Sequence, residues 1–115
     1  RFPSLRVATI ESGSEWVHPL IKKLAKAHSM TPGAFTVDPV ERLRTNVWVA
    51  PYYEDDIRHL ADAIGSGHVL FGSDWPHAEG LADPKSFVDD LAGFSDDEIH
   101  QIMRTNAEAL SAPPA

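Results

Sequence analysis

A short stretch of the chain places an aspartate and a histidine directly after a buried strand. Residues 69–71 form an apolar run, which is typical of a strand covered on both faces. The run ends at Gly72, and the polar loop that follows carries Asp74 and, three residues later, His77. Loops at the carboxyl ends of parallel strands carry the chemistry of α/β folds. A carboxylate there can bind a divalent metal, act as a general base, or do both.

A second carboxylate, Glu11, follows another apolar run and is a candidate catalytic partner for Asp74. If one strand lies between the two runs, Glu11 and Asp74 face the same end of the sheet. Each also has a structural interpretation, Glu11 as a surface carboxylate or helix cap and Asp74 as a turn residue. We assign His77 and Trp75 to the substrate pocket, with loop filling and core packing as their respective alternatives.

Strands that could position these side chains are predicted over residues 5–10, 46–50 and 69–72, where β-branched and apolar residues predominate. A helix is predicted after the first strand, with Ser14 as its N-cap and apolar residues at helical spacing. The chain over residues 28–37 shows no such spacing and is expected to be irregular.

Capping residues mark the remaining helices. The predicted ranges are 38–45, which opens with an Asp-Pro pair; 54–64, which is acidic at its start and ends before Gly65; 83–91; and 95–110, which opens with a capping box formed by Ser95 and Glu98. Residues 111–115 contain two prolines and are expected to be a disordered tail, so the predicted domain covers residues 1–110.

Other polar residues are assigned roles in the fold. Asn106 is expected to hydrogen-bond to the backbone near one end of the fold. Five histidines lack the spacing of a metal-ligand set and are expected to be structural or solvated, namely His18, His28, His59, His68 and His100.

Alternation of strands and helices predicts an α/β fold built from parallel βα units with right-handed crossovers. Three strands can neither close a barrel nor cover both edges of their sheet, so the chain is expected to be part of a larger fold. Uncovered edges also predict a homo-oligomer.

Composition narrows the classes of partner. The 115 residues carry a net charge of −7, which argues against nucleic acid. There is no cysteine, so a metal would need His, Asp or Glu as ligands. No apolar run reaches the roughly 20 residues that span a bilayer, and no signal peptide is recognisable. We therefore expect a cytoplasmic protein without a nucleic-acid or membrane partner.

Three segments carry a family resemblance. The first segment resembles the sixth strand and helix of amidohydrolase-related metal-dependent enzymes. It consists of Arg-Phe-Pro-Ser-Leu-Arg-Val at 1–7 and Glu-Ser-Gly-Ser-Glu-Trp-Val at 11–17. Gly-Ser-Asp-Trp-Pro-His at 72–77 is similar to the loop after their eighth strand, and residues 102–110 resemble their closing helix. This branch also contains the aminocarboxymuconate-semialdehyde and resorcylate decarboxylases.

The resemblance implies a (β/α)8 TIM barrel, of which this chain would be the C-terminal portion, about strands six to eight. The family binds its metal through a His-x-His pair after strand one, a histidine after strand five and the aspartate after strand eight. Asp74 is the counterpart of the last ligand, so this chain alone does not complete the set. The implied metal is Zn, with Mn or Fe as alternatives.

The function that the resemblance implies is hydrolysis of a small organic substrate by a metal-activated water. An alternative is non-oxidative, metal-dependent decarboxylation of an aromatic or enoic acid. The decarboxylase carries a catalytic histidine after strand six, where this chain has Glu11. A decarboxylation mechanism that depends on this histidine is therefore not expected of this chain. A third alternative is an inactive βα fragment that only self-assembles.

Overall fold

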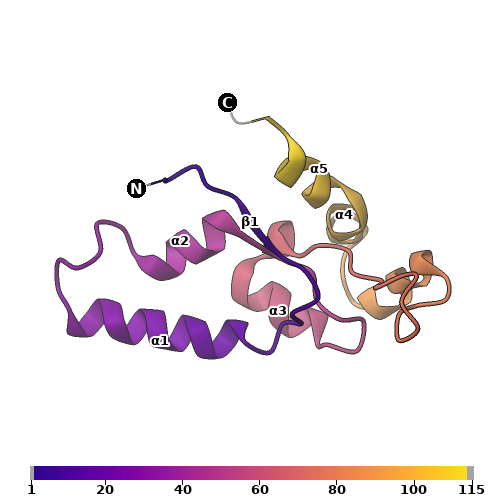
Figure 1. Cartoon of the computed structure of the whole chain (residues 1–115), viewed down its shortest axis with the longest axis horizontal. Helices are drawn as coiled ribbons and strands as arrows, with labels where there is room; N and C mark the ends of the chain where they lie inside the picture. Colours follow the sequence, from indigo (N-terminus) through magenta and orange to yellow (C-terminus); the bar gives the residue numbers. More distant parts are fainter. Residues whose placement is uncertain (1, 114–115) are drawn as a thin grey trace.

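The computed structural model describes residues 2–113 and shows parallel strands alternating with helices (Figure 1). Strands β1 (Val7–Thr9) and β2 (Val47–Val49) pair in parallel, with Val7 opposite Val47. Between them the chain forms helices α1 (Val17–Met30) and α2 (Pro39–Asn46), and α3 (Ile57–Ile64) follows β2. The predicted mixed α/β class with parallel strands is confirmed.

The predicted third strand over residues 69–72 is wrong as a regular strand. Val69 forms a single parallel bridge with Val49, and the Leu70 amide donates to the Val49 carbonyl at 2.8 Å. In a parallel ladder the next hydrogen bond would come from the amide of residue 51. Pro51 has no N–H to donate, so the pairing stops after one bridge. The extended segment nevertheless lies beside β2, which places β2 between it and β1.

Helix α1 differs from its prediction at both ends. Ser14 is not its N-cap, because the helix starts at Val17 and the Ser14 hydroxyl donates instead to Asp55 Oδ2 at 2.9 Å. At the other end the helix continues to Met30, through residues predicted to be irregular. No glycine or proline lies between Pro19, in the first turn of α1, and Pro32, and the Thr31 amide donates to the Ala27 carbonyl to close the last turn.

The predicted caps at Asp38, Asp83 and the Ser95–Glu98 box are confirmed, and Asp56 is a cap where only an acidic helix start was predicted. Asp38 accepts a hydrogen bond from the Val40 amide at the start of α2, and Asp56 accepts one from the His59 amide at the start of α3. Asp83 caps η2 (Pro84–Leu91), which is a 3-10 helix. The Ser95–Glu98 capping box opens α4 (Asp96–His100).

The closing helix is continuous but changes its winding. After α4 the chain forms a π-helical stretch, η3 (Gln101–Thr105), and then α5 (Asn106–Ser111). Asn106 is buried, and its amide donates to the carbonyls of Ser66 and Val69 at 2.7 and 2.8 Å. The predicted backbone contact of Asn106 is therefore confirmed. Of the predicted disordered tail, Ser111 ends α5, and residues 114–115 lie outside the described part.

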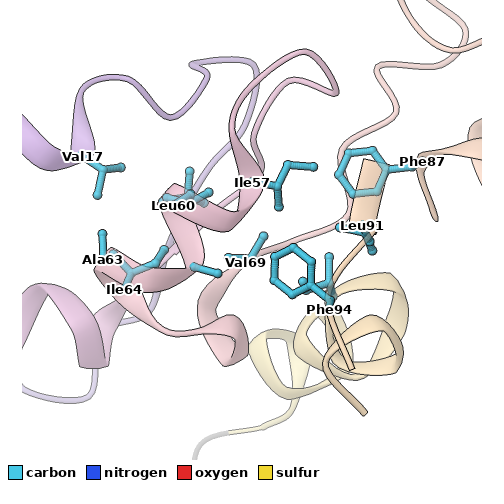
Figure 2. Close-up of a cluster of buried hydrophobic side chains, with 12 residues drawn as sticks. Val17, Ile57, Leu60, Ala63, Ile64, Val69, Phe87, Leu91 and Phe94 are labelled. Atoms are coloured by element: carbon cyan, nitrogen blue, oxygen red, sulfur yellow. The ribbon is translucent and has the colours of Figure 1, made fainter. Parts of the chain in front are cut away.

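The main core is one cluster of buried hydrophobic side chains that gathers around α3 (Figure 2). Side chains from α1, α3, η2 and the extended segment meet there, and the largest that are fully buried are Phe87, Leu60, Leu91, Ile102, Val17, Val49 and Val69. Trp48, Ala50 and Leu70 form a second, smaller cluster, against which Leu110 packs. Each burial removes apolar surface from water and stabilises the fold.

The first strand is left largely uncovered. Leu5, Val7 and Ile10 are exposed by 56%, 40% and 60%. Arg6 anchors this segment, because its guanidinium donates to the carbonyls of Ala109 and Ala112 beside α5. In the described residues no helix is long and apolar enough to span a bilayer.

Candidate active site

The loops that follow β1, β2 and the extended segment meet at one end of the strands and enclose a pocket of about 500 Å³. Its wall combines residues from all three loops, namely Glu11, Tyr52, Tyr53, Glu54, Asp55, Asp74, His77 and Glu79. The structure therefore brings Glu11, Asp74 and His77 together, as expected if one strand separates the first and third segments. Trp75, 59% exposed, lines a smaller pocket of about 250 Å³ that also includes Glu11 and Asp74.

Asp74 is held by a loop that folds back on itself. Its carbonyl accepts the His77 amide at 2.8 Å, and the Leu81 amide donates to the Ser73 carbonyl at 2.9 Å to close the loop. Gly80 passes so close that an added Cβ would overlap the backbone of Asp74. The Asp74 side chain is 22% exposed, and its Oδ2 lies 3.6 Å from His77 Nδ1. Asp74 and His77 are thus near enough for a charge interaction, but too far apart for a hydrogen bond.

Glu11 and Asp74 also share an uncommon backbone conformation. Their φ angles are 55° and 54°, and in the described residues no other residue besides glycine has a positive φ. This left-handed region is sterically unfavourable for a residue with a Cβ, and such residues concentrate at functional sites. The conformation therefore favours a functional interpretation of both carboxylates over a purely structural one.

The pocket is strongly acidic. Five carboxylates line it, and the described wall residues include no lysine or arginine. The neighbouring Glu54 raises the pKa of Tyr53, first by a hydrogen bond and then by its charge, because both disfavour a negatively charged phenolate. The field in this pocket therefore favours bound cations and positively charged groups.

The residues that the structure describes do not by themselves complete a metal site. Within residues 2–113 no three His, Asp or Glu side chains converge closely enough to hold an ion. Asp74 offers a carboxylate, which suits Zn, Mn or Fe, and His77 lies beside it as a second donor. The donor chemistry is thus suitable but the number of ligands is insufficient.

Several residues of this region were not found by sequence reasoning. Gly80 bears no motif, and its role follows from the closeness of the Asp74 backbone alone. Tyr52 and Asp55 contact the turn after β1 from the loop after β2, across about 40 positions of sequence. His18 and His59 stack with ring centroids 3.6 Å apart, although they come from different helices. Contacts of this kind leave no local pattern in the sequence.

Comparisons with known proteins show the family and the fold. A family model described as amidohydrolase matches residues 1–110. The chain is similar to an amidohydrolase from Mycobacterium avium subsp. paratuberculosis K-10, with a TM-score of 0.91 and 57% sequence identity, over 94% of this chain and 28% of that one. It is similar in fold to 5-carboxyvanillate decarboxylase from Sphingomonas paucimobilis, with a TM-score of 0.69 and 20% identity, over 96% of this chain and 34% of that one. The chain spans about a third or less of the length of either protein.

Proposed function

Because the chain belongs to the amidohydrolase family, we propose that it supplies Asp74 and Glu11 to the active site of a metal-dependent hydrolase. The observation that carries this proposal is the shared pocket wall, which joins two carboxylates far apart in the sequence at the carboxyl ends of parallel strands. The strands would correspond to about strands six to eight of an eight-stranded barrel. The chain matches 28% of the length of the Mycobacterium protein, which is the share expected of two to three of eight βα units.

Each residue has a chemical role in this proposal. Asp74 would contribute one carboxylate ligand to a divalent ion and would accept a proton from a water molecule in the pocket. When bound, the ion lowers the pKa of water and stabilises negative charge that develops on the substrate. Glu11 accepts or returns a proton at the same pocket, while His77 and Trp75 contact the substrate. The substrate is a small organic molecule with a carbonyl or equivalent electrophile.

A hybrid enzyme tests the proposal. The matched 28% of the Mycobacterium amidohydrolase is replaced by this chain, so that the remainder of that protein supplies any ligands that this chain lacks. We expect the hybrid to bind Zn, Mn or Fe in stoichiometric amount, and Asp74→Ala to lose most of it. Asp62→Ala removes an exposed carboxylate from α3, outside the pocket, and should keep the metal. Elemental mass spectrometry of the purified proteins gives the metal content.

The product distinguishes the remaining functions. Metal-dependent release of acid from amides, esters or lactones supports the hydrolase, whereas release of carbon dioxide from an aromatic or enoic acid indicates the decarboxylase. A folded hybrid that binds equal metal with and without Asp74, or that binds none, contradicts the proposed role of Asp74. Absence of both products would favour the self-assembling fragment.

A further inference from the structure

The turn after β1 is bound to the loop after β2 by contacts between distant residues. The Tyr52 hydroxyl donates a hydrogen bond of 2.8 Å to the Glu11 carbonyl. The Tyr52 ring also packs against Gly13, where an added Cβ would lie 3.0 Å from two ring carbons. Gly13 adopts its φ of 58° without steric cost, but Glu11 at 55° does not. Glu11 therefore keeps this conformation only while its surroundings hold it there.

Asp55 joins the two loops through a single oxygen atom. Its Oδ2 accepts hydrogen bonds from the Ser14 hydroxyl at 2.9 Å and from the Tyr52 amide at 3.1 Å. Ser14 is buried, so loss of its partner would leave a polar group without water to replace it. Asp55 thus fixes the position of the turn after β1 relative to the loop after β2.

We propose that Tyr52 and Asp55 are positioning residues that hold Glu11 in its left-handed conformation on the pocket wall beside Asp74. They act through the backbone of the Glu11 turn, since the Tyr52 hydroxyl is already bound to the Glu11 carbonyl. The inference rests on the proposed function, because the conformation of Glu11 affects catalysis only if its carboxylate acts in the pocket. The specific contribution is to keep two carboxylates from separate loops in one fixed arrangement.

Tyr52→Phe tests the inference in the 115-residue chain, because it removes one hydroxyl and keeps the ring against Gly13. In a residue with positive φ, the amide proton and Hα of the same residue are close and give an intense NMR cross-peak. We expect this cross-peak at Glu11 in the native protein and a loss of at least half its intensity in Tyr52→Phe. Tyr53→Phe is the matched control, because the Tyr53 hydroxyl bonds to Glu54 and not to the turn.

Thermal unfolding midpoints of the same proteins distinguish positioning from general stabilisation. A general loss of stability lowers the midpoint but leaves the Glu11 conformation of the folded state unchanged. Ser14→Ala removes a donor to Asp55 and should weaken the same cross-peak. If Tyr52→Phe does not fold, Ser14→Ala tests the positioning of Glu11 in its place. A cross-peak that Tyr52→Phe retains in full, or that Tyr53→Phe loses equally, overturns the inference. Neither result requires metal or turnover, so failure of the hybrid enzyme is a separate outcome.

Discussion

At the scale of single residues, the position of Asp74 depends on a neighbour that has no side chain. Gly80 passes so close to the carbonyls of Ser73 and Asp74 that a methyl group at this position would overlap them. Close approach of two backbone segments is one of the few situations in which only glycine fits. The conformation of the Asp74 loop therefore depends partly on Gly80, six positions further along the chain.

Replacement of Gly80 should disturb the site and the fold together. We expect Gly80→Ala to lower the free energy of unfolding by about 1–3 kcal/mol, because the loop must shift to accommodate the methyl group. Gly67→Ala is the matched control, since nothing lies within 4 Å of an added Cβ there, and its effect should stay within about 1 kcal/mol. Urea unfolding measures both variants, and equal stability of the two would show that the Asp74 loop is not constrained at Gly80.

At the scale of elements, α1 and α3 pack with a pair of histidines between them. The rings of His18 and His59 are nearly parallel, with an angle of 7°. Burial, the charge of His59 and then the charge of Lys22 lower the pKa of His18, and Asp62 opposes them more weakly. Other carboxylates face the pair from the start of α1 and the loop before α3, namely Glu15, Glu54, Asp55 and Asp56.

The packing of α1 against α3 should therefore weaken in acid. A lowered pKa means that the unfolded chain takes up a proton on His18 more readily than the folded chain does. The contribution of His18 is fully present above its unfolded pKa of about 6.5 and is lost as the pH falls below that value. We expect the urea midpoint to fall between pH 7.5 and about 5.5, and His18→Gln to reduce this dependence.

His28→Gln is the control for this prediction, because His28 is exposed near the other end of α1 and should leave the pH dependence unchanged. An equal pH dependence in the native protein and in His18→Gln would show that the histidine pair does not couple the two helices. Carboxylates titrate mainly below this pH range, so their contribution is largely separated from that of His18.

At the scale of the whole molecule, the outer side of β1 remains open. The two-stranded sheet ends at β1, and the apolar residues of this segment are exposed along it. An uncovered strand edge offers backbone donors and acceptors to another chain. The net charge of −7 opposes association in general, so any self-association should occur at this less acidic edge.

We therefore propose that the isolated chain forms dimers or larger species through β1. Val7→Lys places a charge on the edge and should shift the protein toward monomer in light scattering over a range of concentrations. Val88→Lys is the control for Val7→Lys. Val88 is also 40% exposed and the change in net charge is the same, but Val88 lies on η2. A native protein that stays monomeric, or an equal effect of both variants, would contradict association through β1.

The sequence by itself determined the features that depend on neighbouring residues. Asp38 and the Ser95–Glu98 box were predicted as caps because each binds a backbone amide two or three positions away. For the helix that Asp56 caps, only an acidic start was predicted. The buried extended segment that precedes Asp74 was predicted by composition, although only Val69 pairs as in a strand. The family was predicted by the Gly-Ser-Asp-Trp-Pro-His motif. Asn106 was predicted to bind backbone, although its partners were not.

Only the tertiary structure decided how the loops meet. The bond from Tyr52 to Glu11 and the stacking of His18 on His59 each join residues 41 positions apart, so no local propensity encodes them. The third strand was shortened to one bridge because Pro51, on the partner strand, lacks the required amide. Local hydrogen bonds within a few residues leave a pattern in the sequence, whereas the shape of the pocket depends on packing between segments that the chain brings together only when it folds.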